Sequence, residues 1–363
     1  MIIELHLIQN FAPSNLNRDD TGNPKDCEFG GVRRARISSQ CLKRSIRHHP
    51  IFQQITGVEP SMRTRLLAGE IKKELLKRGV AEEQAQNLAE TFAKHYSSKT
   101  EKGALDKGRT NVLLFLSRAE IEDIAGQLMQ ISNPDEIKKF AENFAKSNKD
   151  RPSAPDIALF GRMLADRPDT NVDAACQVAH AISTHRVTMD IDYFTAVDDL
   201  LPQEETGAAM VGVIAFNSAC FYRYAAIDFN QLVTNLNGDR EMARKTVEAF
   251  FHAAVRAVPS GKQNSFAAQN PPSFVMAVVR EEQQGWSLVN AFEKPVHASA
   301  RKSLTQASIE ALDQYWKKLC AFYGDKPRTF VALLEEDVSL EALKDARCKD
   351  FDQLTKAVID TLL

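Results

Sequence analysis

The sequence predicts an α+β protein with a ferredoxin-like, or RRM-like, core that is interrupted by a helical lobe and a long β-hairpin. Three observations support this prediction. Residues 2–11 alternate apolar and polar, as a strand does, and residues 60–149 place leucines at helical spacing. Val187–Phe194 and Gly212–Asp228 are β-prone and flank a polar, turn-rich stretch. Without lobe and hairpin, strand, helix, strands, helix and strand remain, which is compatible with that core.

The amino-terminal elements follow from local signals. The alternation from Ile2 to Phe11 predicts a strand with one buried face, on which His6 and Phe11 are the only rings that could stack on a base. Gly30-Gly31 allows a sharp bend, and the extended segment after it places arginines on both faces. Ser38 is a predicted N-cap for a helix from Gln40 to His49, with Leu42 and Ile46 on one stripe.

Later elements are predicted in the same way. Ser117 opens a capping box before one helix of the lobe, and Asn133-Pro134 starts another. A short strand is expected over 156–163, ending at an exposed tip, and a helix from Val172 to about Ser183. The hairpin follows, then a helix over 241–258, a buried strand over 274–280 and a mostly helical last hundred or so residues.

Composition limits the class of protein. The chain has 363 residues, 44% of them hydrophobic and 26% charged, with a formal net charge of -2. These values are typical of a globular protein larger than one small domain. No apolar run reaches the length of a membrane helix and the amino terminus has no leader pattern, so we expect a cytoplasmic protein. The six cysteines are scattered without metal-ligand spacing, so neither metal nor cofactor is expected.

Positive charge is concentrated between Val32 and Arg47, where VRRARISSQCLKRSIR holds six Lys or Arg and no acid. In a chain of nearly neutral total charge, such a stretch predicts a local site for a polyanion. The start of the Ser38-capped helix would add backbone N–H groups and the positive end of the helix dipole, which suit phosphate oxygens. A solvated charged helix face is the alternative.

No catalytic constellation emerges. His48-His49 and Asp19-Asp20 could in principle form a metal site, but adjacent histidines diverge on a helix. His180 and His185 lie among apolar residues and are expected to be satisfied core histidines. There is no phosphate-binding glycine loop and no G-x-S-x-G motif.

Several ordered blocks resemble CasC, the backbone subunit of type I-E CRISPR Cascade complexes. The similarity spans most of the chain and is weakest in the helical lobe and at the carboxyl terminus. Val32 departs from the family pattern, in which a Lys is expected. The blocks are Asn17–Asp20, Phe29–Gly31, Arg33–Gln40, Leu42–Arg44, Asp156–Met163, Ala179–His185, Asp190–Leu200, Phe221–Ala225, Gly261–Gln263, Ala267–Pro271 and Asn290–Lys294.

The resemblance implies a palm formed by residues 1–58 and 180–363, helical fingers over 59–179, and a thumb hairpin at about 187–215. It implies a non-catalytic subunit that polymerises head to tail along CRISPR RNA (crRNA) and presents it to target DNA. Its other partners would be the large, small, capping and crRNA-processing subunits of Cascade, with no membrane partner and no cofactor.

Site residues are expected in three groups. The crRNA backbone would be contacted by the basic stretch and its neighbours, which the charge pattern and the resemblance together give as Arg18, Lys25, Arg33, Arg34, Arg36, Ser38, Gln40, Lys43, Arg44 and Arg47, with Lys262 and Gln263 in a later loop. A wedge beside a displaced nucleotide would comprise Met163, Tyr193, Phe194, Thr195 and Val197. Target DNA would meet Lys138, Lys139, Lys146 and Lys149.

Each group has an alternative. Tyr193 and Phe194 could be a buried hairpin pair, Met163 a core residue, and each lysine of the lobe a solvated one. Related type III subunits cleave bound target RNA with an aspartate after the first strand, where this chain has Asp20 and Asp26. A free-standing, monomeric single-strand RNA-binding protein is the third possibility.

Overall fold

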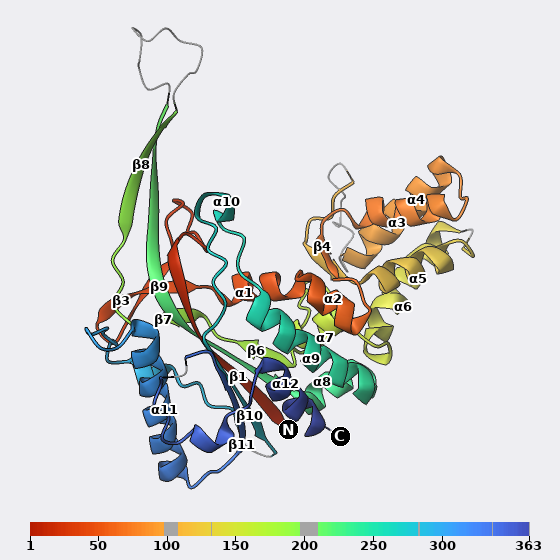
Figure 1. The fold of residues 1–363 in the computed structure, drawn as a ribbon. Helices are drawn as coiled ribbons and strands as arrows, with labels where there is room; N and C mark the ends of the chain where they lie inside the picture. The colour runs from red at the N-terminus through yellow and green to blue at the C-terminus, as the bar shows by residue number, and fades with distance from the viewer. Residues whose placement is uncertain (98–107, 132, 197–209, 282–283, 336, 363) are drawn as a thin grey trace, which may run out of the picture. The chain divides into compact units, whose positions relative to one another are not determined.

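The computed structural model describes residues 1–97, 108–131, 133–196, 210–281, 284–335 and 337–362, which form two compact units (Figure 1). Unit 1 comprises Met1–His49, Val178–Ala226 and Phe250–Leu363, and unit 2 comprises Pro50–Gln177 and Ile227–Ala249. The predicted division at 58 and 180 differs from this one chiefly because residues 227–249 belong with the helical unit.

Unit 1 is built on an antiparallel sheet whose strand order is β11-β10-β1-β9-β7-β3-β2, with β6 and β8 also paired to β9. In the central pair, β1 runs from Ile2 opposite Arg280 to Ile8 opposite Phe274. The strands are β1 (Ile2–Ser14), β2 (Asp26–Phe29), β3 (Val32–Ile37), β6 (Cys176–Val178), β7 (Ala181–Ser183), β8 (Asp190–Ala196), β9 (Met210–Asp228), β10 (Phe274–Arg280) and β11 (Arg328–Leu333).

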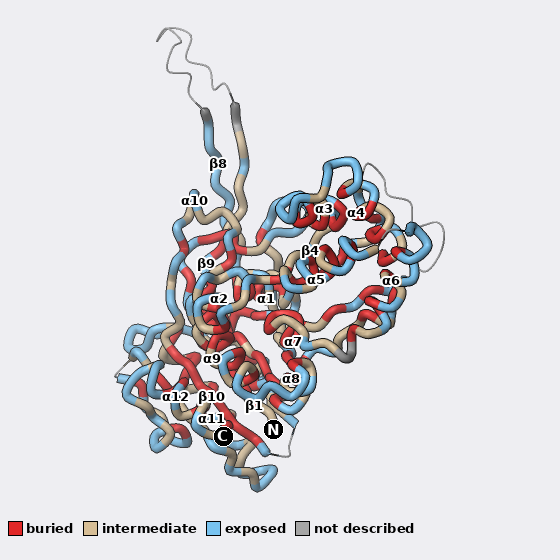
Figure 2. The backbone as a smooth tube through the Cα atoms, turned by 90° about the vertical axis from the view of Figure 1, so that its right-hand side faces the viewer, coloured by how far each residue is buried: buried red, intermediate tan, exposed pale blue. Residues whose placement is uncertain are grey.

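The first strand is buried on both faces from Ile3 to Gln9, so the expectation of one buried face is wrong (Figure 2). A polar network covers the second face. Glu4 accepts hydrogen bonds from the Arg280 side chain and from the Trp286 backbone N–H at 2.7 Å, and His6 Nδ1 lies 2.9 Å from the Tyr222 hydroxyl. His6 and Phe11 are therefore interior side chains, which leaves no ring on this strand for a base to stack on.

Helices on unit 1 complete its core. Helix α1 (Ser39–Arg47) contributes Leu42 to the buried cluster that includes Phe11 and Phe221, and α11 (Leu304–Tyr323) contributes Ile309 and Trp316 to a second cluster. The last hundred residues contain strand β11 and extended stretches, so the expectation of mostly helix was only partly right. The remaining helices here are α10 (Gln263–Phe266) and α12 (Phe351–Asp360), while α9 (Arg240–Arg256) crosses the boundary of the two units.

The long hairpin is confirmed. Strands β8 and β9 pair from Asp190 opposite Phe216 to Ala196 opposite Met210 and run together away from the sheet (Figure 1). The pairing places Tyr193 opposite Val213 and Phe194 opposite Gly212. Phe194 covers Gly212 so closely that a Cβ at residue 212 would overlap its ring.

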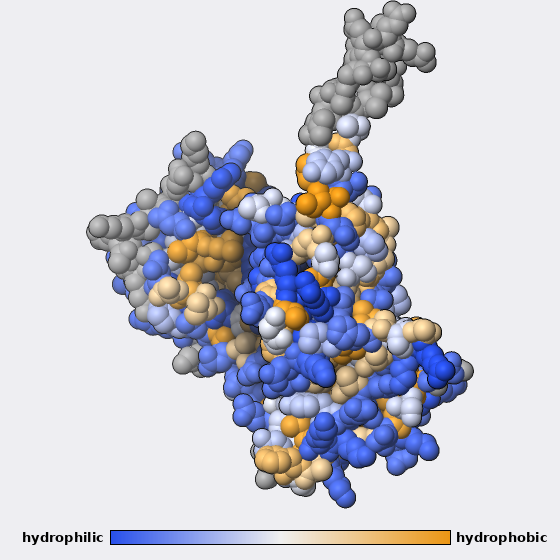
Figure 3. Space-filling model, turned by 90° about the vertical axis from the view of Figure 1, so that its left-hand side faces the viewer, coloured by the Kyte–Doolittle hydropathy of each residue, from blue (hydrophilic) through white to orange (hydrophobic). Residues whose placement is uncertain are grey.

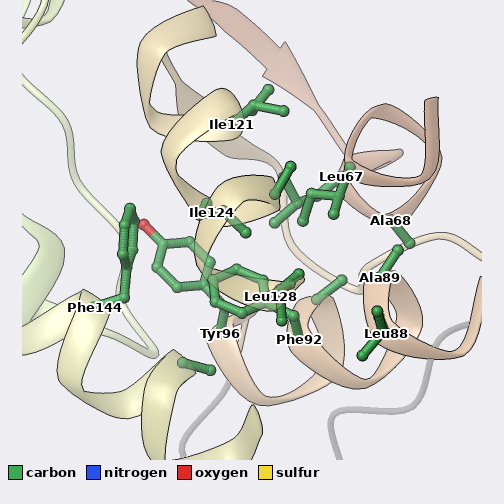
Figure 4. Packing of buried hydrophobic residues seen from close by; sticks show 14 of the residues in the cluster. Leu67, Ala68, Leu88, Ala89, Phe92, Tyr96, Ile121, Ile124, Leu128 and Phe144 are labelled. Atoms are coloured by element: carbon green, nitrogen blue, oxygen red, sulfur yellow. The ribbon is translucent and has the colours of Figure 1, made fainter. Parts of the chain in front are cut away.

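Unit 2 is a helical body around one apolar cluster, part of which is shown in Figure 4, where Phe92, Tyr96 and Phe144 lie together. The predicted caps are confirmed: both bonds of the Ser117–Glu120 capping box form, and Asn133 caps the helix that begins at Pro134. Its elements are α2 (Pro50–Thr56), β4 (Met62–Thr64), α3 (Leu67–Lys77), α4 (Glu82–Ser97), β5 (Leu114–Leu116), α5 (Arg118–Leu128), α6 (Pro134–Lys146), α7 (Pro155–Phe160) and α8 (Phe229–Asn235).

Two local predictions were wrong. Residues 155–160 form helix α7 and not a strand, because Pro155 starts the helix and the Asp156 carboxylate accepts from the Ser61 N–H and hydroxyl at 2.9 and 2.6 Å. Gly161, at φ 75°, ends it. The predicted helix over 172–183 contains strands β6 and β7 instead, because pairing with β9 outweighs helix propensity.

Candidate nucleic-acid interface

The basic stretch begins on a tight hairpin. Strands β2 and β3 are joined by Gly30 and Gly31, both with positive φ, and a Cβ at Gly30 would overlap the Glu293 carbonyl. In extended β3 the consecutive residues Arg33 and Arg34 point to opposite faces, so the arginines are divided between both faces as predicted. Arg33 is exposed and forms an ion pair with Asp26, whereas Arg34 is fully buried.

Arg34 is a structural residue. Its guanidinium donates to the carbonyl oxygens of Phe29 at 3.1 Å, Ser183 at 3.1 Å, Phe292 at 2.7 Å and Glu293 at 3.2 Å. Burial lowers the pKa of this guanidinium, and four carbonyl acceptors compensate its charge. The expectation that Arg34 contacts RNA is therefore corrected: its donors are used inside the protein.

Arg36 is half-buried and its side chain lies next to an exposed histidine, His180. Its Nε donates to the Asp26 carbonyl at 3.1 Å, and its Nη1 lies 3.1 Å from His180 Nδ1. His180 is exposed, so the core interpretation of this residue is wrong. Partial burial, Arg36 and Lys25 together lower the pKa of His180, as expected for an imidazole among cations. No local signal marks this residue in the sequence, because it reaches Arg36 only through the pairing of β3 with β7.

Helix α1 has the predicted cap and the predicted two faces. The Ser38 hydroxyl accepts from the Cys41 N–H at 3.3 Å, and Leu42 and Ile46 are buried. Gln40 and Arg44 are exposed and Lys43 is half-buried, so three of the predicted contacts lie on the outer face. Arg47 is buried, with its Nη2 3.0 Å from His48 Nε2, which corrects its assignment as an RNA contact.

A loop between β1 and β2 continues this surface. Asn17 accepts two hydrogen bonds of 2.8 Å, one from the Ser38 N–H to its side-chain Oδ1 and one from the Lys25 N–H to its backbone carbonyl. The first of these joins the loop to the start of α1. A pocket of about 520 Å³ is lined by Arg18, Arg44 and the backbone around Gly261, among others. The structure thus brings the Arg18 loop, α1 and the loop at 260–263 together within unit 1.

The two residues predicted in that last loop differ. Lys262 is half-buried with left-handed backbone, next to a glycine whose Cβ would overlap the Leu16 carbonyl. The Gln263 side chain donates to the carbonyls of Pro259 at 3.0 Å and Ala268 at 3.3 Å. Gln263 therefore stabilises the loop, and its assignment to RNA is not supported by its contacts.

Apolar side chains cover the hairpin, where Figure 3 shows hydrophobic surface just below the grey atoms. Tyr193 is 69% exposed and Phe194 is 43% exposed, so they are not the buried pair of the alternative interpretation. Thr195 is exposed as well, and Val197 lies outside the described residues. Isolated apolar side chains are common on surfaces, but a row of them on a projecting ribbon indicates an interaction site.

In unit 2, Met163 follows Gly161 and is 85% exposed, as predicted for a tip and unlike a core residue. Lys138, Lys139 and Lys146 are exposed on α6, and the side chain of Lys149 lies outside the described residues. These lysines have the exposure that binding to DNA requires, which equally fits a solvated helix face.

Of the two aspartates named for the rival nuclease interpretation, Asp20 is exposed and Asp26 has a structural partner. The neighbouring Asp19 is not one of the two: its Oδ1 accepts from the Thr21 hydroxyl at 2.8 Å and from the N–H groups of Thr21 and Asn23 at 2.9 Å, bonds that lower its pKa. The Asp26 carboxylate pairs with Arg33. Within the described ranges, no three His, Cys, Asp or Glu side chains gather as metal ligands do, and no helix is long and apolar enough to cross a bilayer.

Comparison with protein families identifies the chain. The family model described as CT1975-like protein matches residues 3–358. The chain belongs to the CT1975-like protein family. It is also similar to a solved chain titled "CRISPR RNA-guided surveillance complex, pre-nicking", with 32% identity, a TM-score of 0.88 and full coverage of both chains.

A second similar chain, titled "CRISPR RNA-guided surveillance complex", is 28% identical with a TM-score of 0.77, over 99% of this chain and 100% of the other. No curated protein matches. The family and these two structures support the resemblance to a Cascade subunit noted in the sequence.

Proposed function

We propose that this CT1975-like protein is the crRNA-binding backbone subunit of a type I-E Cascade complex, that it polymerises head to tail along the guide, and that it presents the guide to target DNA. The observation that carries the proposal is the accessible basic surface of unit 1. It consists of Arg18, Lys25, Arg33, Arg36, Gln40, Lys43, Arg44 and Lys262. Ser38, also predicted to contact RNA, is buried and caps α1. The similarity to two chains from RNA-guided complexes supports it.

The topology of unit 1 supports an RRM-like palm. Along the chain β1, α1, β7, β9, α9 and β10 follow the β-α-β-β-α-β order, and in the sheet β1 and β9 lie between β10 and β7. The inward position of His6 and Phe11 argues against stacking on this strand, so the RNA is bound at one edge of the sheet and not on its face.

The surface suits a ligand read by its backbone and not by its sequence. Its side chains are guanidinium, ammonium and amide groups, which donate hydrogen bonds to phosphate oxygens. A guide holder must accept any guide sequence, and phosphate contacts carry no sequence information. Removing one phosphate-binding side chain should reduce the salt slope of single-strand binding by about 0.7.

The test is the salt dependence of RNA binding to the whole chain. Lys43→Ala and Arg44→Ala should each lower the slope by about 0.7 and leave sequence preference unchanged. Lys318→Ala, an exposed lysine on α11 outside this surface, is the control and should keep the slope of the wild type. Unchanged slopes in both α1 variants would return this helix to the solvated interpretation.

Head-to-tail assembly is assigned to the hairpin. A contact between different surfaces of identical subunits propagates as a filament, whose length the RNA would set. Gel filtration should show multimers that grow with RNA length, and Tyr193→Asp should reduce them more than it reduces binding of a short RNA. Tyr323→Asp alters a comparably exposed tyrosine on α11 and should not. A fixed small complex on long RNA would favour a free-standing RNA-binding protein.

We further propose that the subunit is not a nuclease, since the carboxylate of Asp26, one of the two candidate aspartates, is held in an ion pair with Arg33. Labelled complementary RNA, offered with magnesium to the assembled complex, should stay intact. Regularly spaced cuts that disappear in Asp26→Ala would instead show the type III activity.

A further inference from the structure

The hairpin leaves the sheet of unit 1 where strand β1 ends, and the side chain of Asn15 lies at this point. Strand β1 ends at Ser14, whereas its neighbour β9 extends beyond it as part of the projecting hairpin (Figure 1). Asn15 is fully buried, and its Nδ2 donates to the Ala215 carbonyl of β9 at 2.9 Å. Ala215 pairs with Ile191 in the hairpin ladder, so the Asn15 amide adds a lateral hydrogen bond to the base of the hairpin.

The same Nδ2 group also binds the Arg18 loop, which is formed by residues 17–25 and belongs to the basic surface. Besides the Ala215 carbonyl, it donates to the Gly22 carbonyl of this loop at 3.0 Å. The loop is closed on itself by a β-bridge between Arg18 and Pro24, so Gly22 and Arg18 are expected to move together. One buried amide therefore joins the RNA-binding loop to the base of the hairpin.

A second contact reaches the same place from the loop at 260–263. The ring of Phe216, in β9, lies 5.5 Å from the ring of Phe266, measured between centroids, and Phe266 ends the helix α10 that follows this loop. A Cβ at Gly261 would lie 2.7 Å from the Asn15 carbonyl oxygen, so the loop is in close contact with the backbone at Asn15. The base of the hairpin and both loops thus meet around one residue of unit 1.

The amide of Asn15 is not an optimal group for stability at this position. Its two donors are used on two carbonyl oxygens, which fixes the orientation of the amide. Among the residues that the structure describes, its Oδ1 has no hydrogen-bond partner. A buried acceptor without a partner lowers stability, so the contribution that distinguishes Asn15 is the connection made by its two donors.

We propose that Asn15 is a positioning residue that couples RNA binding at the Arg18 loop to the direction of the hairpin. RNA phosphates bound by Arg18 and Arg44 fix the loop, the Gly22 carbonyl then fixes the Asn15 amide, and the amide fixes β9 at Ala215. RNA thereby favours the hairpin direction that meets the next copy. The inference rests on the proposed function, to which it adds how RNA binding controls assembly. Such coupling is reciprocal, so assembly should strengthen RNA binding by the same factor.

The test is amide hydrogen exchange of the whole chain, measured by mass spectrometry with and without a short single-stranded RNA. The RNA is the shortest that gives a one-to-one complex on gel filtration, so that no neighbouring copy covers the hairpin. In the wild type, RNA should slow exchange in peptides of the Arg18 loop. It should also slow exchange roughly fivefold in the hairpin peptides that cover 190–196 and 210–216, the factor expected for one neutral hydrogen bond.

In Asn15→Ala, RNA should still protect the Arg18 loop but should no longer slow exchange in the hairpin. A merely structural role would lower the melting temperature and leave the response of the hairpin to RNA unchanged. Asn270→Ala is the matched control and should keep this response, because the Asn270 side chain accepts from the Ala12 N–H of β1 at 3.3 Å. Thermal melting verifies that each variant is folded. Asn15→Ser serves if Asn15→Ala is not, since one hydroxyl cannot donate to both carbonyls.

Exchange in the loop and in the hairpin separates the two proposals. If RNA protects the Arg18 loop but not the hairpin of the wild type, the coupling proposal is wrong and the proposed function stands. The same conclusion follows if RNA protects the hairpin equally in the wild type and in the Asn15 variant. If RNA does not protect the Arg18 loop of the wild type, the proposed function itself fails.

Discussion

Arg33 and Arg34 are neighbours of the same type, yet we expect their replacement by methionine to affect different properties, stability for Arg34 and RNA binding for Arg33. Arg34 is buried and makes four hydrogen bonds to carbonyl oxygens that belong to β2, β7 and the segment at 292–293. Hydrogen bonds to a charged group are worth about 1.5–3 kcal/mol each, are not additive, and leave unsatisfied acceptors when removed. Arg34→Met should therefore lower the free energy of unfolding by about 3–5 kcal/mol.

Arg33 makes a solvent-exposed ion pair with Asp26, a type of contact that contributes at most about 1 kcal/mol. Arg33→Met should thus leave stability within about 1 kcal/mol of the wild type, and should lower the salt slope of RNA binding by about 0.7. Urea denaturation followed by circular dichroism measures the first quantity, and filter binding at several salt concentrations measures the second. Equal destabilisation by the two variants, or a normal salt slope for Arg33→Met, would refute the reasoning.

Two further predictions concern the same surface. In urea denaturation, Gly30→Ala should lower the free energy of unfolding by more than about 2 kcal/mol, because the new Cβ would both displace a carbonyl group and stand on a residue with positive φ. Gly31 also has positive φ but open space around it, so Gly31→Ala should lower the free energy of unfolding by only about 1 kcal/mol. Equal losses in the two variants would contradict this prediction. RNA affinity should increase as the pH falls from 8 to 6, because bound phosphates would offset the positive charges of Arg36 and Lys25 and so raise the pKa of His180. In filter binding, His180→Gln should make the RNA affinity less dependent on pH. Without RNA, a lower pH should instead reduce the stability of the protein. The pKa of His180 is lower in the folded state than in the unfolded one, so protonation of His180 destabilises the fold increasingly below about pH 6.5. If the melting temperature of the wild type fell on acidification by no more than that of His180→Gln, this effect of His180 would be excluded.

Local signals in the sequence predicted local structure well. The Ser38 cap, the Leu42 and Ile46 stripe, the Ser117 capping box and the paired strands of the hairpin are all present. Each depends on residues a few positions apart, or on an alternation along one segment, so neighbouring residues suffice to specify it.

Features set by distant parts of the chain were not predictable. The charge of Arg34 is identical to that of Arg33, and only the carbonyls of Ser183, Phe292 and Glu293 decide that it is interior. The second buried face of β1 depends on Arg280, which is 276 positions from Glu4. For the same reason His180 was assigned to the core, because its neighbour Arg36 is brought to it by the pairing of β3 with β7.

The most direct test of the central claim is an electron cryo-microscopy map of this chain assembled on single-stranded RNA. We predict that the sugar-phosphate backbone runs along the surface formed by Arg18, Lys25, Arg33, Lys43 and Arg44, and that the β8–β9 hairpin of an adjacent copy lies against the bound RNA. A map in which the RNA is bound elsewhere, with this surface facing solvent, would contradict it.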